Sequence, residues 1–222
     1  MSAALVTQES APAATFEARD LAHRYGRRAG LEPLSFTIAG PGAVAVTGPN
    51  GAGKSTLLRI AAGLLRANRG ESALTVAGRA IPPADRRRWV GYAGPELSFY
   101  DELSVHENLA FVAEARGLPA DSAAVALARV GLESRSADRV AALSSGMKQR
   151  LRLAFALLHR PPVLLLDEPG GHLDDEGRTT LFGLIDEERR QGLVLIATND
   201  EREWKLAERR IELRGRGLGH PA

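Results

Sequence analysis

The sequence of 222 residues contains no cysteine, which excludes disulfide bonds and thiolate metal sites. It also contains no apolar run that approaches the roughly 18 residues that a membrane-spanning helix needs. The N-terminal segment MSAALVTQESAPAATFEAR has neither a basic start nor an apolar centre, so we do not expect a signal peptide. These absences favour a protein of the reducing cytoplasm that reaches a membrane only through a partner.

Lysine is also scarce, because 26 of the 29 basic side chains are arginine. The formal net charge is +2 and the arginines are scattered, apart from residues 86–88 and the C-terminal tail, so we expect no direct nucleic-acid binding. A hydrophobic content of 44% suits one α/β domain with a sizeable core. We expect residues 1–13, rich in Ala, Ser and Pro, to be disordered and residues 14–222 to form that domain.

The segment GPNGAGKST, residues 48–56, is the clearest motif. An apolar run precedes it and the helix-like LLRIAAGLL follows, so the pattern G-x-x-x-x-G-K-S stands between a strand and a helix, as a phosphate-binding P-loop does. Glycines let the backbone N–H groups surround a phosphate. Lys54 should contact the β- and γ-phosphates, and Ser55 should bind Mg²⁺. The motif predicts binding of a nucleoside triphosphate by Gly48, Pro49, Asn50, Gly51, Ala52, Gly53, Lys54, Ser55 and Thr56.

Two adjacent acids follow a second apolar run, VLLL at residues 163–166. A run that is apolar at every position is typical of a parallel strand buried on both faces. Asp167 and Glu168 then lie at the edge where open α/β sheets bind their ligands. We expect Asp167 to act on Mg²⁺ beside Ser55 as an outer or water-mediated ligand, and Glu168 to act as the general base for a water that attacks the γ-phosphate.

The other segments predict strands over residues 15–26 and 31–40, a hairpin over 72–81, and helices within about 96–160. Ser104 and Glu107 form a capping box at the start of one such helix. Residues 161–222 should complete the sheet, with a helix over 201–210 and a hairpin-like end. Tyr25, between the first two strands, is either an ordinary turn tyrosine or an aromatic that stacks on adenine.

The segment LSSGM, residues 143–147, precedes the helical KQRLRLAFALL and resembles the LSGGQ signature of ABC ATPases, with two substitutions. Other motifs occur in the family's order: Tyr25 falls at the A-loop aromatic, residues 48–56 at Walker A, 163–168 at Walker B and 170–174 at the D-loop. The resemblance implies a RecA-like P-loop NTPase core of residues 14–95 and 161–222, with an antiparallel β subdomain and a helical subdomain of about 96–160.

The same resemblance implies ATP and Mg²⁺ as cofactors and a head-to-tail dimer with an identical or similar ATPase. In ABC ATPases the signature binds the nucleotide held by the other subunit, which implies the same for Ser144, Ser145, Gly146 and Met147, with Asp174 as the D-loop aspartate. It further implies a transmembrane permease as partner, with the chain on the inner face of the cell membrane.

Two positions depart from the family's pattern. At the Q-loop position, where the family usually has glutamine, this chain has Glu96. Its carboxylate can still bind Mg²⁺ but adds a negative charge near the γ-phosphate. At the position of the family's switch histidine, this chain has Asn199. Its side chain is shorter and neutral, so it can donate a hydrogen bond to a γ-phosphate oxygen only if its loop lies closer to the nucleotide. We therefore expect ATP binding to be retained and hydrolysis to be slower.

Residues 91–111, GYAGPELSFYDELSVHENLAF, resemble the ATPase subunit of haem exporters of cytochrome c maturation. We therefore predict an ATP-hydrolysing ABC transporter subunit whose substrate is haem or another small molecule. Leu97, Phe99 and Tyr100 either contact the membrane partner or pack locally. One alternative is a degenerate cassette that clamps ATP beside an active subunit. The other is a non-transport ABC ATPase. Proteins of that kind usually carry two tandem cassettes or a long coiled-coil insertion, and this sequence has neither.

Overall fold

A computed structural model describes residues 14–26 and 28–214. Residues 1–13, for which disorder was predicted, lie outside the described part. The strands are β1 (Ala14–Tyr25), β2 (Arg28–Ala39), β3 (Gly42–Thr47), β4 (Arg69–Val76), β5 (Arg79–Ile81), β6 (Val90–Ala93), β7 (Val163–Asp167), β8 (Leu193–Ala197) and β9 (Arg209–Glu212). The α-helices are α1 (Lys54–Ala61), α2 (Val105–Ala115), α3 (Ser122–Arg129), α4 (Ser145–Leu157), α5 (Asp175–Gln191) and α6 (Glu201–Trp204), and 3₁₀ turns cover Pro83–Arg88, Glu133–Arg135 and Val140–Ala142.

A five-stranded parallel sheet in the order β6-β7-β8-β3-β9 forms the centre of the molecule. Every residue of β7 and β8 is buried, as the continuous apolar run predicted. In the strand register, Ala197 of β8 pairs with both Val46 of β3 and Asp167 of β7. The carboxyl ends of three neighbouring strands therefore lie level at one edge of the sheet.

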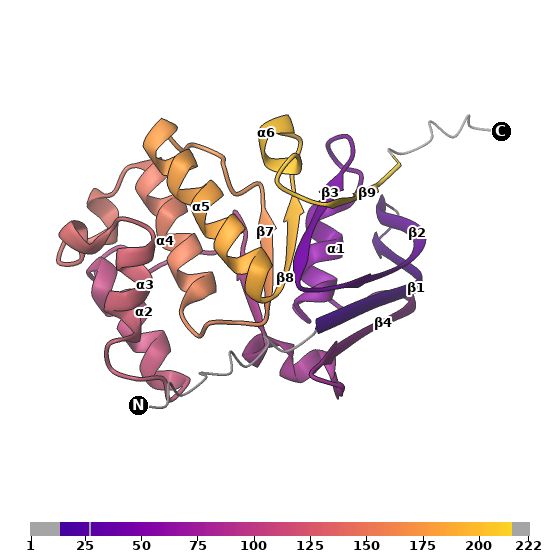
Figure 1. Cartoon of the computed structure of the whole chain (residues 1–222), viewed down its shortest axis with the longest axis horizontal. Helices are drawn as coiled ribbons and strands as arrows, with labels where there is room; N and C mark the ends of the chain where they lie inside the picture. Colours follow the sequence, from indigo (N-terminus) through magenta and orange to yellow (C-terminus); the bar gives the residue numbers. More distant parts are fainter. Residues whose placement is uncertain (1–13, 27, 215–222) are drawn as a thin grey trace, which may run out of the picture.

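A second sheet is antiparallel, in the order β2-β1-β4-β5. Helix α1 contacts strands of both sheets, while α5 packs on β3 and β8 from the opposite face of the parallel sheet (Figure 1). The large apolar side chains Phe16, Leu57 and Leu165 are almost fully buried in the core around α1. The predicted fold class, a P-loop type α/β core with an antiparallel β subdomain, is confirmed by this arrangement and by the structural relatives described below.

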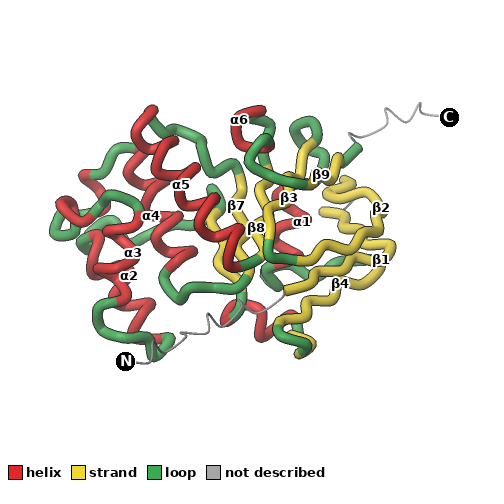
Figure 2. Tube along the Cα trace, viewed as in Figure 1, coloured by secondary structure: helices red, strands yellow, loops and turns green. Residues whose placement is uncertain are grey.

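The helices α2, α3 and α4 lie at the end of the molecule away from the antiparallel sheet (Figure 2). Helix α2 begins with the predicted capping box, because the Ser104 Oγ accepts from the Glu107 N–H at 3.1 Å and the Ser104 N–H donates to Glu107 Oε2 at 2.7 Å. The three helices join through the fully buried side chains of Leu109, Leu127 and Leu151. None of the helices in the described part of the chain is long and apolar enough to cross a membrane.

The C-terminal part differs from the sequence prediction. The helix predicted over residues 201–210 ends at Trp204, and residues 209–212 form β9, a strand parallel to β3. Most of the hairpin-like end predicted for residues 211–220 lies outside the described part. The physical reason is the open edge of β3, whose unpaired backbone groups attract a further strand and override the local helical pattern. Residues 215–222 lie outside the described part.

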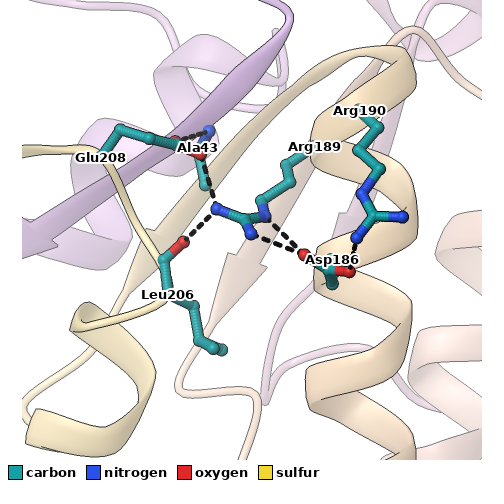
Figure 3. A network of polar contacts seen from close by, with 6 residues as sticks. All are labelled: Ala43, Asp186, Arg189, Arg190, Leu206 and Glu208. Atoms are coloured by element: carbon teal, nitrogen blue, oxygen red, sulfur yellow. Dashed lines mark hydrogen bonds and ion pairs between the residues drawn. The ribbon is translucent and has the colours of Figure 1, made fainter.

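An arginine near the end of α5 ties the chain entering β9 to the sheet (Figure 3). Arg189 donates to Asp186 Oδ1 within its own helix, to the Leu206 carbonyl at 3.2 Å and to Glu208 Oε1 at 2.6 Å. The other oxygen of Glu208 accepts from the backbone N–H of Ala43 in β3 at 2.6 Å. This network fixes the path of the chain between α6 and β9.

We expect Arg189→Met to lower the free energy of unfolding by about 1 kcal/mol, because it removes several partly exposed charged hydrogen bonds at once. The matched control is Arg190→Met, since among the described residues Arg190 pairs only with Asp186, at the surface, and should contribute less than about 0.5 kcal/mol. Urea unfolding of the three proteins measures the difference. Equal losses for both variants would contradict a specific role of Arg189 in holding β9.

Candidate functional site

The P-loop, residues 48–56, leaves the end of β3 and opens into α1 with a backbone that only glycine adopts easily. Gly48, Gly51 and Gly53 have φ angles of 142°, 79° and 105°, all in the left-handed region. A Cβ atom at Gly48 would lie 2.5 Å from the Leu213 carbonyl oxygen, and one at Gly53 would lie 2.4 Å from that of Gly30. No side chain caps α1 at Gly53, so the N–H groups of its first turn are left to bind an anion.

Lys54 lies almost buried among oxygen atoms. Its Nζ donates to the Gly48 carbonyl at 2.9 Å and to Asn199 Oδ1 at 3.1 Å, and it is 3.8 Å from Glu168 Oε1. The ammonium is therefore fixed over the loop that it follows in sequence, where it can face the outer phosphates of a bound nucleotide.

Asp167 ends β7 with its side chain buried and neither carboxylate oxygen hydrogen-bonded. Burial raises the pKa of Asp167, while the Ser55 hydroxyl and the charges of Arg59 and Lys54 oppose the rise. A buried carboxylate without partners next to a hydroxyl is a donor set that suits Mg²⁺. The described residues hold no group of three or more His, Cys, Asp or Glu that could bind a metal alone.

Glu168 follows with its backbone in the left-handed region, at φ 49°. Its N–H donates to the Ala197 carbonyl at 2.8 Å, which extends the pairing of β7 with β8 by one residue. Burial raises the pKa of Glu168, and the nearby Lys54 ammonium opposes the rise. About half of the side chain is exposed, so its carboxylate is accessible to a water molecule.

A cavity of about 570 Å³ brings these groups together. It is lined by Tyr25, Arg28, Gly30, Asn50, Gly51, Gly53, Lys54, Ser55, Thr56 and Glu168. Tyr25 is 46% exposed, and its hydroxyl is 3.5 Å from Thr56 Oγ1. Its ring packs against the backbone of Gly30, where a Cβ atom would lie 2.6 Å from the ring. The His23 ring also meets it edge to face, at 4.6 Å between centroids. Nearly half of Tyr25 stays exposed, so part of the ring is available for stacking on a base.

Arg28 is a cavity residue that the sequence reasoning missed. It pairs directly with Tyr25 in the β1–β2 register, because β2 begins at Arg28 and not at residue 31 as predicted, so the sequence reasoning had left it in the turn. Its guanidinium adds a second cation to the tyrosine side of the cavity, where it can face the nucleotide.

Asn199, at the end of β8, bridges two parts of the P-loop. Its Oδ1 accepts from Lys54, and its Nδ2 donates to Asn50 Oδ1 at 2.8 Å. Glu96 accepts from Arg59 of α1 and from the Tyr92 hydroxyl, each at 2.7 Å. Its carboxylate therefore faces Arg59, although its charge is close enough to Asp167 to affect the pKa of that group. Asn199 therefore contacts the P-loop itself, whereas Glu96 contacts α1, the helix that follows the loop.

The signature residues and Asp174 do not line this cavity. Ser144 and Ser145 are exposed at the start of α4, where the Ser144 Oγ accepts from the Met147 N–H at 3.2 Å. Gly146 lies against the D-loop, because a Cβ atom there would be 2.8 Å from the His172 carbonyl oxygen. Asp174 caps α5 by accepting from the Gly177 N–H at 2.8 Å. Within one chain, the signature and the P-loop are therefore separate surfaces.

The family model described as "ABC transporter" matches residues 31–171, which is more than half of the chain. The chain belongs to the ABC transporter family. The match includes the P-loop, the segment around Glu96, the signature and both acids after β7. The prediction of an ATP-binding subunit of the ABC ATPase class is therefore confirmed.

Two bacterial relatives support the same family. The cytochrome c biogenesis ATP-binding export protein CcmA of Xanthomonas campestris pv. campestris (strain 8004) is 38% identical over 182 residues, which cover 82% of this chain and 84% of CcmA. The linearmycin resistance ATP-binding protein LnrL of Bacillus subtilis (strain 168) is 31% identical over 82% of this chain. The aligned region spans only 60% of LnrL.

Solved structures agree on the fold. An ATP-binding subunit of an ABC transporter matches with a TM-score of 0.77 and 30% identity, covering 90% of this chain and 87% of that chain. The dimeric post-hydrolysis structure of the cassette MJ0796 with ADP and Pi matches with a TM-score of 0.78 and 22% identity, covering 89% of this chain and 94% of that chain. The latter supports the fold alone.

We expect Tyr25→Ala to weaken ATP binding by about 1–3 kcal/mol, because an accessible aromatic face is lost. Tyr25→Phe is the matched control and should bind ATP nearly as well as the native chain, since stacking needs the ring and not the hydroxyl. Titration with a fluorescent ATP analogue, checked by calorimetry with ATP, measures the dissociation constants. Native affinity in Tyr25→Ala would show that the tyrosine is an ordinary turn residue.

Proposed function

We propose that this cassette hydrolyses Mg-ATP in a head-to-tail dimer and thereby drives a membrane permease that exports a small molecule such as haem. The observation that carries the proposal is the single cavity that unites the P-loop with Tyr25, Lys54 and Glu168 beside the buried Asp167. Residues 14–222 act as one cassette, in which residues 96–160 form the helical subdomain. The chain lies at the cytoplasmic face of the membrane through its permease.

The geometry supports the following roles for residues of the site. The adenine stacks on Tyr25, and the loop N–H groups with Lys54 hold the phosphates. Ser55 and Asp167 would hold Mg²⁺, with Glu96 as a further ligand once its contact with Arg59 opens. When bound, the ion would neutralise charge on the phosphates. Glu168 orients a water for attack on the γ-phosphorus, in line with the ADP oxygen that leaves, and accepts the proton that the water loses.

The second half of the site comes from another subunit in this proposal. Ser144 and Ser145 are exposed at the start of α4, and the N–H groups there are suited to a phosphate. Since these residues do not line the cavity of their own chain, a second cassette must present them, together with Gly146, Met147 and the D-loop around Asp174. The dimer can consist of two copies or of two related chains.

An exposed aromatic pair supports docking of the permease on the helical end. Tyr100 and Phe111 are 61% and 59% exposed, and their rings meet edge to face at 6.4 Å between centroids. Phe99 instead packs on Phe155, so of the aromatic residues suggested by the sequence only Tyr100 supports a docking role. The relative CcmA carries a name that combines cytochrome c biogenesis with export, and this supports haem as the transported molecule.

We expect the purified chain to hydrolyse Mg-ATP, and Glu168→Gln and Lys54→Ala to lose turnover by at least about 10²-fold. The two variants should differ in binding: Glu168→Gln keeps its affinity for ATP and accumulates dimer on size-exclusion chromatography, whereas Lys54→Ala loses phosphate contacts and binds weakly. Phosphate release and ATP titration provide the two measurements. Native turnover in Glu168→Gln would contradict its role as the base.

A degenerate, ATP-clamping cassette is the second candidate, and Asn199 is the observation that favours it. Its neutral amide cannot supply a cation to the γ-phosphate. We expect Asn199→His to raise the hydrolysis rate while ATP affinity stays within about 2-fold, since the ion-binding and P-loop groups are unchanged. Asn199→Ala is the control that removes the contact to Lys54 without adding a ring.

The comparison of these rates decides between the two candidates. A slow native rate that Asn199→His increases supports a working but slowed ATPase. A native chain that binds ATP without any turnover, and becomes active only with histidine, is a clamp that depends on an active partner subunit. Equal rates in the native and Asn199→His proteins would show that asparagine serves as well as histidine.

A further inference from the structure

Gln149 of α4 is a buried polar residue, 5% exposed, whose amide lies against the turn that follows β7. Its Nε2 donates to the Pro169 carbonyl at 3.0 Å and lies 3.5 Å from the Glu168 carbonyl oxygen. Its Oε1 accepts from Arg152 Nη1 at 3.0 Å. The neighbours allow only this amide orientation, because a flipped amide would place Oε1 against two carbonyl oxygens.

The turn that Gln149 contacts is strained. A glutamate at φ 49° occupies a conformation that is unfavourable for a non-glycine residue and persists only where its surroundings fix it. The Ala197 carbonyl accepts from the Glu168 N–H on one side of the turn, and the Gly171 N–H donates to the Glu168 carbonyl on the other. Gln149 adds the contact from the helical end of the molecule, and it reaches the carbonyls of both Glu168 and Pro169.

Arg152 extends this contact to a third segment. Its Nε donates to the Leu97 carbonyl at 3.1 Å, while its Nη1 holds the Gln149 amide. Leu97 directly follows Glu96, and the exposed Tyr100 lies three residues further along. One guanidinium therefore joins the loop after Glu96 to the amide that supports the backbone of Glu168.

We propose that Gln149 is a positioning residue that holds the backbone of Glu168 in its catalytic conformation, and that Arg152 makes this support depend on the position of the loop at Leu97. Since α4 begins at the signature residues, a shift of α4 or of the loop moves the amide and with it the turn. The inference rests on the proposed role of Glu168 as the base. It assigns to two side chains the physical link between the helical end and the hydrolytic centre.

The test compares Gln149→Met and Arg152→Met with Arg150→Met. Methionine has nearly the size of glutamine but no amide, so Gln149→Met should lower kcat by at least about 10-fold, because a misplacement of 1 Å can cost about 10²-fold. The dissociation constant for ATP should stay within about 2-fold, since no nucleotide contact is removed. Arg150 is the matched control, because among the described residues its one hydrogen bond is to the surface carbonyl of Gly131 at 3.3 Å, and its variant should keep the native kcat.

A double variant tests the link between the two residues. If Arg152 acts through Gln149, Arg152→Met should lower kcat by a smaller factor, and Gln149→Met with Arg152→Met should be no slower than Gln149→Met alone. If the factor by which kcat falls in the double variant equals the product of the factors in the two single variants, the link is overturned. If circular dichroism shows that Gln149→Met does not fold, Arg152→Met and Arg152→Lys provide the test instead. A kcat equal to that of Arg150→Met in both variants overturns the proposal. A lower kcat in Arg152→Met that is partly restored in Arg152→Lys supports it.

The assays separate failure of this inference from failure of the proposed function. If Glu168→Gln is inactive while Gln149→Met turns over at the native rate, Glu168 is the base but Gln149 does not position it. If Glu168→Gln retains native turnover, the role of Glu168 fails and the inference fails with it. A parallel loss of ATP affinity and kcat in Gln149→Met would identify a general structural role and would also overturn the proposal.

Discussion

The parallel pairing of β3, β7 and β8 is the constraint on which the site depends. Ala197 pairs with Val46 on one side and with Asp167 on the other, so the three strands end at the same level. The bonds continue past the strands, because the Thr198 N–H donates to the Val46 carbonyl and the Glu168 N–H to the Ala197 carbonyl. The chain then leaves the three strands as the P-loop, the acid pair and the segment of Asn199. Burial of the apolar strands therefore brings polar groups together that have no mutual attraction of their own.

Bringing these groups together places two acidic side chains close to each other, and a bound cation would reduce their repulsion. Asp167 and Glu168 are adjacent acids, and burial raises the pKa of both. Lys54 approaches Glu168, but neither oxygen of Asp167 has a hydrogen-bonding partner. A divalent ion that arrives with phosphate oxygens would relieve the unpaired carboxylate and match the charge of the nucleotide at the same time. The site is thus arranged so that the two ligands favour each other's binding.

Sequence reasoning succeeded where a function needs a local backbone shape. The positions of Gly48 and Gly53, the strand before them and the helix after them follow from spacing alone, and the capping box of Ser104 and Glu107 is equally local. It failed where distant segments decide the outcome. Residues 209 and 210 belong to the predicted helix but pair with the open edge of β3. The contacts of Asn199 with Asn50, of Glu96 with Arg59 and of Gln149 with Pro169 join residues far apart in the chain, which no periodicity encodes.

The two departures from the family's pattern have a common physical consequence. Glu96 contacts Arg59 of α1, and Asn199 contacts Lys54 and Asn50 of the P-loop. Each residue thus attaches its own loop either to the P-loop or to the helix that follows it. A half-exposed ion pair such as that of Glu96 and Arg59 contributes at most about 1 kcal/mol, and a neutral hydrogen bond contributes a similar amount. A nucleotide with its cation offers stronger, charge-assisted partners to the same groups. Because replacing these contacts with contacts to the nucleotide costs little free energy, the loops that carry Glu96 and Asn199 can move with the phosphates. A cassette needs such movable loops if ATP binding is to change the positions of its segments.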